Sequence, residues 1–209
     1  CSNLAYYLYQ LHPGSSETLF AGQRAFARFV HMSNAPIKLH IGGEEAKSGW
    51  TILNVQDGPD VDAVGDCRDL SQFADESVAE IYASHVFEHL GYLDDLPKAL
   101  SECSRVLAPN GRLRISVPDF ETLCRLFLHP RLDAEQRFAV MRIAFGGQTD
   151  AYDFHMVGLT IEFLEDYLRV AGFTSIERVE KHGLFDDSST LDIGGVPISL
   201  SVVATKPSN

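Results

Sequence analysis

The sequence predicts an α/β fold in which a mostly parallel sheet carries helices on both faces. Strand-like runs, either continuous and apolar or alternating, recur along most of the chain. They lie at residues 37–41, 52–55, 61–64, 81–83, 113–117, 176–179 and 198–204. Helical patterns fall between several of these runs, and this alternation is typical of parallel strands joined by helical crossovers.

The first three strands are predicted from short runs that each end in a turn. Ile37, Leu39 and Ile41 alternate with polar residues, which is the period of two expected of a strand, and Gly42 and Gly43 follow. The second and third runs are shorter, and each leads into polar residues. Because the carboxyl ends of parallel strands share one edge of an open sheet, we expect a ligand site at that edge.

The middle of the chain predicts a buried strand, a helix and another strand. The short apolar run 81–83 is typical of a strand buried on both faces. Residues 94–107 carry apolar side chains at helical spacing, with Asp94 or Asp95 as cap and Pro97 in the first turn. The alternating strand 113–117 follows this helix.

The C-terminal part predicts one more helix and two strands. Thr160 is a good helix cap and Gly172 is placed to end that helix. A strand at 176–179 and a turn-rich loop at 183–190 come next. The alternating run 198–204 is predicted to close the sheet as an antiparallel edge strand.

Composition narrows the class of protein. The 209 residues are 45% hydrophobic and 22% charged, as in one globular domain. We expect a helical cap segment over residues 1–34 and the main domain over 35–209. The formal net charge of −12 argues against nucleic acid as a partner, because affinity for phosphates depends on Lys and Arg.

The same survey predicts a soluble cytoplasmic protein. No apolar run approaches the ~20 residues of a membrane helix, so we expect no membrane partner. The four cysteines show neither paired nor metal-type spacing, which favours a reducing compartment. The oligomeric state is not indicated by the sequence.

Residues after the first three strands could hold a nucleotide-like ligand. Glycines allow backbone amides to approach a charged ligand closely, and carboxylates or amides can accept from ribose hydroxyls and an adenine amino group. We predict that the glycine turn, the second strand end and the third strand end take these roles in that order. The residues are Gly42 and Gly43, then Gln56 and Asp57, then Asp66 and the Cys67 amide.

In these features the chain resembles the class I S-adenosylmethionine-dependent methyltransferases, and specifically the type-11-like group. The resemblance rests on residues 39–43, 64–70, 81–90 and 105–113, with further likeness at 145–148, 152–155 and 171–173. It implies a Rossmann-like, seven-stranded sheet with S-adenosyl-L-methionine as cofactor. It also implies that Ser84 and His85 line the reactive side of that cofactor.

Two positions depart from the family pattern. Glu44 stands where the family continues its glycine-rich run with a small residue, and Gln56 stands where an acid is common. An amide accepts from a hydroxyl less strongly than a carboxylate does. We therefore expect weak cofactor binding or a shifted pose.

Methyl transfer to an oxygen or nitrogen needs alignment and, for some acceptors, a base. His85 and His155 are the predicted bases, and Asp119, at the end of a strand, is predicted to hold substrate. The expected acceptor is a small molecule or sugar-like compound, which the sequence does not identify.

Two other functions are open at this point. The run His85-Val86-Phe87-Glu88-His89 matches H-x-x-E-H, an inverted zinc-protease motif. That chemistry needs both imidazoles on one continuous helix and a third ligand, so the sequence disfavours a zinc hydrolase and predicts no resident metal. The second alternative is a methyltransferase-like fold without catalysis that serves as a binding module, favoured by Glu44 and Gln56.

Overall fold

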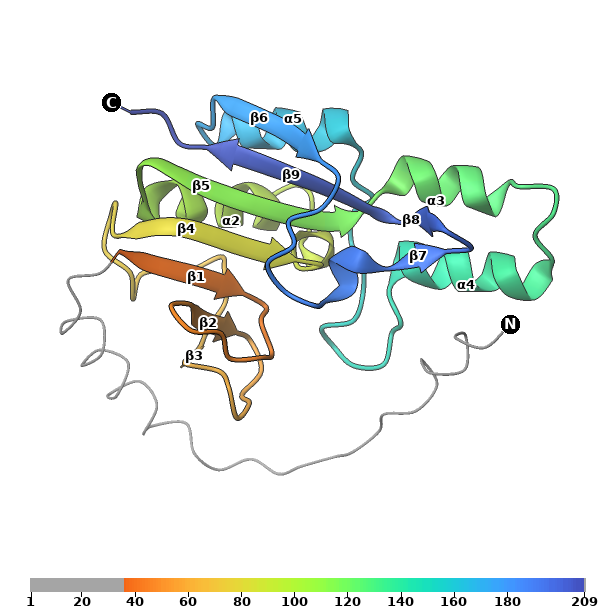
Figure 1. The fold of residues 1–209 in the computed structure, drawn as a ribbon, viewed down its shortest axis with the longest axis horizontal. Coiled ribbons are helices and arrows are strands. Elements are labelled where there is room, and N and C mark those ends of the chain that lie inside the picture. Colours follow the sequence, from red (N-terminus) through yellow and green to blue (C-terminus); the bar gives the residue numbers. More distant parts are fainter. Residues whose placement is uncertain (1–35, 209) are drawn as a thin grey trace.

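A seven-stranded sheet forms the centre of the computed structural model, which describes residues 36–208 (Figure 1). The strand order is β3-β2-β1-β4-β5-β9-β6. The strands are β1 (Ile37–Ile41), β2 (Thr51–Asn54), β3 (Ala63–Val64), β4 (Val78–Ser84), β5 (Leu107–Pro118), β6 (Ser175–Val179) and β9 (Ser199–Thr205). Strands β1 to β5 pair in parallel, which confirms the predicted fold class. The cap segment predicted for residues 1–34 lies outside the described residues.

Within residues 36–208, four α-helices are arranged around this sheet. They are α2 (Asp95–Val106), α3 (Phe120–Phe127), α4 (Ala134–Phe145) and α5 (Ile161–Val170). Helices α2 and α5 touch each other and cover one face of the sheet, whereas α3 and α4 form a pair beyond the carboxyl end of β5 (Figure 1). The predicted cap is confirmed at α5, where the Thr160 side chain accepts from the Phe163 amide.

The face under α2 and α5 is the apolar core. Leu39, Ile81, Leu113 and Val202 lie on neighbouring strands at alternating positions, and all are fully buried. Each fully buried side chain of this size contributes about 1.5–3 kcal/mol by leaving water. The alternation seen in the sequence therefore sets which face of each strand the helices cover.

The opposite face of the sheet is polar. Its central strands carry Lys38, Glu80 and Arg114, joined by ion pairs of 3.1 Å and 2.6 Å from the Lys38 Nζ and Arg114 Nε atoms to the Glu80 carboxylate. Beside them, His40 and Tyr82 pack against Phe185. In the described part of the chain, the segment 182–190, which contains only a short 3₁₀ turn, covers this region and no α-helix does. Helices α2 and α5 pack on the other face, whereas the sequence predicted helices on both faces.

The connection from β1 to β2 explains part of this arrangement. Residues 42–50 join the two parallel strands without a helix, although parallel crossovers ordinarily need about a dozen residues or more. Trp50, at the end of this short connection, contacts Phe185 with ring centroids 5.3 Å apart. The C-terminal segment thus packs where a longer connection would have placed its own side chains.

Three details differ from the sequence prediction. The antiparallel strand β9 lies inside the sheet, between β5 and β6, so β6 is the edge strand on that side. Helices α3 and α4 were not predicted. A two-stranded ribbon of β7 (Asp192–Ile193) and β8 (Val196–Pro197), also unpredicted, precedes β9. Among residues 36–208, no helix is long and apolar enough to cross a membrane.

His40 gives the folded protein a specific sensitivity to acid. The ring is 5% exposed and its Nδ1 atom has no hydrogen-bond partner among the described residues. Burial lowers the pKa of His40 to about 4, whereas the unfolded value is about 6.5. Between these two values the unfolded chain binds a proton that the folded chain excludes, so stability falls as the pH falls from 6.5 towards 4.

We expect His40→Phe to reduce the acid-induced loss in the free energy of unfolding by up to about 3 kcal/mol. The phenyl ring keeps the ring contacts of the imidazole. Urea denaturation of both proteins at several pH values between 7 and 4 measures the difference. The same slope of stability against pH in variant and wild type would contradict the assignment. At pH 7 we expect the variant to be as stable as the wild type or more so.

Candidate functional site

The carboxyl ends of β1, β2, β3 and β4 lie at one edge of the sheet, as expected for neighbouring parallel strands. Gly42 has φ 77°, and a Cβ atom there would lie 2.5 Å from the Val86 Cγ2 atom. A Cβ atom on Gly43 would lie 2.5 Å from the His40 Nδ1 atom. Both glycines are therefore required by close packing. In addition, the Gly42 amide donates to the Leu53 carbonyl oxygen.

Asn54, which the sequence did not single out, organises the end of β2. Its side-chain amide donates to the Gly43 carbonyl, with Nδ2 and O 3.0 Å apart, and its Oδ1 accepts from the Gln56 backbone amide. Gln56 and Asp57 are exposed at the same strand end. Asn54 thus ties the glycine turn to the predicted ribose-binding position.

Asp66 lies after β3 beside a cation from its own loop. Its carboxylate accepts from the Arg68 side chain, with Oδ2 and the Arg68 Nη2 2.5 Å apart, and from the Arg68 amide. These bonds hold the pKa of Asp66 below its usual value. Cys67 is buried, which raises the pKa of its thiol to about 12.

Ser84, at the end of β4, contacts the C-terminal segment. Its hydroxyl donates to the Asp187 carboxylate across 3.1 Å, and the Tyr82 hydroxyl donates to the same carboxylate across 2.7 Å. Burial alone would raise the pKa of Asp187, but the hydrogen bonds from Ser189 and Tyr82 reverse the direction and lower it. The turn-rich loop predicted at residues 183–190 is therefore attached to the candidate site.

His85 turns the chain out of β4. Its backbone has φ 53°, a left-handed conformation uncommon for residues other than glycine. The amide donates to the Ser116 carbonyl, and the ring Nε2 lies 2.9 Å from the Ser199 Oγ atom. The other ring nitrogen, Nδ1, lies 3.3 Å from the Glu88 Oε1 atom.

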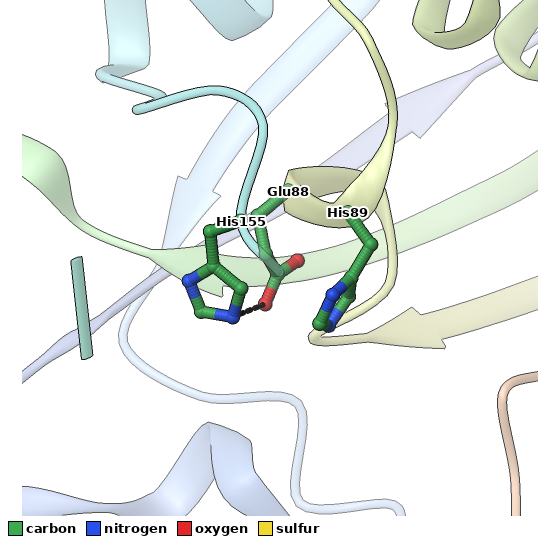
Figure 2. Close-up of side chains that lie close together, drawn as sticks. All are labelled: Glu88, His89 and His155. Carbon is green, nitrogen blue, oxygen red and sulfur yellow. Dashed lines mark ion pairs between the residues drawn. The ribbon is translucent and has the colours of Figure 1, made fainter. Parts of the chain in front are cut away.

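Glu88 lies in the 3₁₀ turn η2 (Phe87–His89) that follows, at the centre of a histidine cluster. Its side chain is 2% exposed, and neither carboxylate oxygen has a hydrogen-bond partner among residues 36–208. The His155 Nε2 atom faces Glu88 Oε1 at 4.0 Å, and His89 lies on the other side (Figure 2). The two imidazole rings meet edge to face, with centroids 4.7 Å apart.

Burial sets the protonation states of this cluster. It lowers the pKa of His85 and of His155 to about 4 in each case. It also lowers the pKa of His89 and raises the pKa of Glu88 to about 8. The imidazoles are therefore neutral at pH 7, and each keeps one nitrogen lone pair.

A tightly bonded loop brings His155 to Glu88. The Met156 amide donates to the Glu88 carbonyl across 2.7 Å, and the His155 amide donates to the Phe145 carbonyl across 3.1 Å. At the start of the loop Gly146 has φ 83°, and a Cβ atom there would lie 2.3 Å from the Asp153 carbonyl oxygen. The histidine is thus fixed by backbone contacts.

Asp119, the third predicted catalytic residue, is engaged elsewhere. Its carboxylate accepts from the Arg178 guanidinium, with Oδ2 and Nη2 2.9 Å apart, and from the Thr122 amide as the cap of α3. It is 4% exposed. The structure therefore brings His85 and His155 together at Glu88 and assigns Asp119 a structural role at the start of α3.

Comparison with known proteins agrees with this arrangement. Residues 23–115, a little under half of the chain, match a family model described as a methyltransferase domain. Over residues 23–115 the chain is therefore similar to methyltransferase domains. S-adenosylmethionine is the cofactor of this family. The family match and the observed strand order confirm the resemblance predicted from the sequence.

One curated relative is malonyl-[acyl-carrier protein] O-methyltransferase of Methylococcus capsulatus, 35% identical over 113 residues, or 54% of this chain. The chain spans only 34% of that relative's length. A solved S-adenosylmethionine-dependent methyltransferase of Archaeoglobus fulgidus is 16% identical, with a TM-score of 0.52 over 89% of this chain and 95% of that one. At this identity the likeness is one of fold.

A second solved structure is the Burkholderia thailandensis 1,6-didemethyltoxoflavin-N1-methyltransferase, with its acceptor and S-adenosylhomocysteine bound. It is 15% identical, with a TM-score of 0.51 over 90% of this chain and 79% of that one. Both similarities extend well beyond the family match, so the methyltransferase fold covers most of the described chain.

The candidate site also contains residues that sequence reasoning missed. Asn54 and Ser199 lie on strands as ordinary polar residues, without a local signal. Glu88 was considered only within the zinc motif. Asp187 shared a loop with Asp186, and a sequence pattern cannot tell which of two adjacent carboxylates turns inward.

Asp187→Ala is expected to lower the free energy of unfolding by about 1–3 kcal/mol. The buried Tyr82 hydroxyl would lose its closest partner, and the nearest remaining one is Ser189 Oγ at 3.4 Å. Urea denaturation measures the change. Asp186→Ala, at the exposed neighbouring position, is the matched control and should shift stability by less than about 0.5 kcal/mol. Equal effects of the two substitutions would show that the Asp187 contacts do not stabilise the domain.

Proposed function

We propose that this chain transfers the methyl group of S-adenosylmethionine to an oxygen or nitrogen of a small-molecule or sugar-like acceptor. The observation that supports this proposal most strongly is that four neighbouring parallel strands end at the same edge of the sheet. They lie in the part of the chain that matches a methyltransferase domain. In an open α/β sheet, this edge is where nucleotide-like ligands bind. The names of the relatives, a malonyl-[acyl-carrier protein] O-methyltransferase and a 1,6-didemethyltoxoflavin-N1-methyltransferase, support methyl transfer to oxygen or nitrogen.

In this proposal the cofactor lies along the strand ends. Gly42 and Gly43 take the methionine part, Gln56 and Asp57 the ribose, and Asp66 with the Cys67 amide the adenine. Ser84 and His85 would then line the side from which the methyl group leaves. Methyl transfer requires an in-line approach of the acceptor, so the main contribution of the protein is alignment.

The acceptor is proposed to bind beside His85 and His155, because these neutral imidazoles lie next to the strand end that would present the methyl group. Each neutral ring keeps one lone pair, which can accept a hydrogen bond from an acceptor hydroxyl or amine once the present contact with Ser199 or Glu88 is exchanged. Asp119 is not included in this role, since Arg178 and the start of α3 occupy its carboxylate.

A binding module without catalysis is the second candidate. It is favoured by groups at the edge that already have protein partners: the Gly42 amide, the Asp66 carboxylate and the Ser84 hydroxyl. Exchange of these contacts for cofactor contacts would cost affinity. Cofactor binding without turnover on any acceptor would favour this candidate.

The proposal predicts that S-adenosylmethionine and S-adenosylhomocysteine bind in calorimetric titrations, whereas a nicotinamide dinucleotide does not. Methyl-labelled cofactor, tested against a panel of hydroxylated and amine acceptors, then measures turnover through formation of S-adenosylhomocysteine. Absence of binding by both sulfur nucleosides would contradict the proposal.

Asp66→Asn is expected to weaken cofactor binding by about 1–3 kcal/mol, because a charged acceptor for the adenine amino group is lost. Asp69→Asn is the matched control, since Asp69 lies on the same loop and its carboxylate accepts from the Ser71 amide. The same calorimetric titration measures both variants. Unchanged affinity in Asp66→Asn would place the adenine elsewhere.

A further inference from the structure

The turn after β4 contains a group whose surroundings are not explained by methyl transfer. Glu88 is 1% exposed, and neither of its carboxylate oxygens has a hydrogen-bond partner in the described part of the chain. Burial of a carboxylate costs several kcal/mol unless it is paired, bonded or bound to a metal. Its recorded ion-pair contacts within residues 36–208 are with His85 and His155.

Glu88 and two of the histidines around it are arranged as metal ligands. Glu88, His89 and His155 each offer one ligand atom, and these atoms lie within 4.8 Å of one another. Ligand atoms on one tetrahedral Zn²⁺ ion lie about 3.4 Å apart, since each bond is about 2.1 Å. The present separations therefore exceed that spacing by up to about 1.4 Å, so binding requires the side chains to rotate towards the ion.

Contacts with backbone groups orient the imidazole rings of His89 and His155. The His89 Nδ1 atom lies 3.2 Å from the Phe154 carbonyl oxygen; because a carbonyl only accepts, Nδ1 carries the proton and Nε2 the lone pair. The His155 Nε2 atom faces Glu88 Oε1 at 4.0 Å, and the Ile143 backbone raises the pKa of this ring against the effect of burial. Metal-binding histidines commonly show this second hydrogen bond to a carbonyl.

We propose that Glu88, His89 and His155 bind one divalent transition-metal ion of the Zn²⁺ type. Two imidazole nitrogens and one carboxylate oxygen suit Zn²⁺, Co²⁺ or Fe²⁺, whereas Mg²⁺ and Ca²⁺ need mainly oxygen ligands. The ion would supply the positive charge that the buried carboxylate lacks. Three protein ligands leave one position open for water or an oxygen ligand.

This site differs from the zinc-hydrolase motif considered in the sequence. That motif requires His85 and His89 on one α-helix, but residues 87–89 form a 3₁₀ turn and His85 has a left-handed backbone. The proposed third ligand is His155, 67 residues beyond Glu88 and brought to it by the loop after α4. The expectation of no metal site was based on the motif alone.

The site would also place an ion on the same strand end as Ser84. An acceptor hydroxyl in the open position would then be held beside the predicted methyl donor, an extension that rests on the proposed function. Metal binding itself does not require that function, and the test below uses no cofactor. Titration of S-adenosylmethionine into the metal-stripped protein tests the proposed function separately.

The test is a metal titration of the full chain after removal of bound ions by a chelator. We expect one Zn²⁺ or Co²⁺ to bind per chain, counted by elemental analysis after desalting, and no saturable binding of Mg²⁺. Co²⁺ should give visible absorption bands of a nitrogen and oxygen site, without the intense near-ultraviolet band of thiolate ligation. Absence of saturable Zn²⁺ and Co²⁺ binding would overturn the proposal.

Substitutions of the proposed ligands test whether the ion binds at this site. Glu88→Gln and His155→Gln are expected to weaken Co²⁺ binding at least tenfold and to change the absorption spectrum. His129→Gln, in the connection between α3 and α4, should leave both unchanged. Circular dichroism checks the fold; if Glu88→Gln unfolds, His89→Gln, at a part-exposed position, provides the comparison. Wild-type binding in His89→Gln and His155→Gln would mean an adventitious ion elsewhere and overturn the proposal.

Discussion

The unpaired carboxylate of Glu88 is the constraint around which the candidate site is organised. The turn that carries it is fixed from two sides: its carbonyl accepts from the Met156 and Val157 amides, and its neighbour Phe87 is fully buried in the core. These contacts hold the backbone that places the Glu88 carboxylate in its buried position. It must therefore be neutralised where it lies, by a proton or by a cation, and the neutral imidazoles of His85 and His155 alone do not provide that charge.

One face of the central strands packs against helices, and the other face carries residues of the candidate site. One face packs α2 and α5 through residues such as Ile81 and Leu113, and this apolar contact supplies most of the stability of the sheet. The other face carries Tyr82 and Ser84, whose hydroxyls both donate to Asp187. The C-terminal segment is thereby attached to the edge where the strands end. Phe185 adds ring contacts with Tyr82 and His40 to these hydrogen bonds.

Local patterns predicted the fold because they act over a few residues. Alternation identified β1 and β9, and Thr160 and Gly172 marked both ends of α5. A local signal for α4 was also present, since Asp133 and Gln136 form a capping box, and α4 could have been predicted from it. The contacts that build the site are of another kind: Ser84 and Asp187 are 103 positions apart. No periodicity or spacing encodes such pairs, because they depend on how loops of different elements meet in space.

The backbone of His85 links the two halves of the site. A left-handed conformation costs a residue with a side chain about 1–2 kcal/mol, and here the Ser116 carbonyl and the Ser199 hydroxyl hold it in place. This turn directs Val86 against Gly42 and places Glu88 towards the histidines. The glycine turn of β1 and the Glu88 cluster are therefore set by one rigid corner.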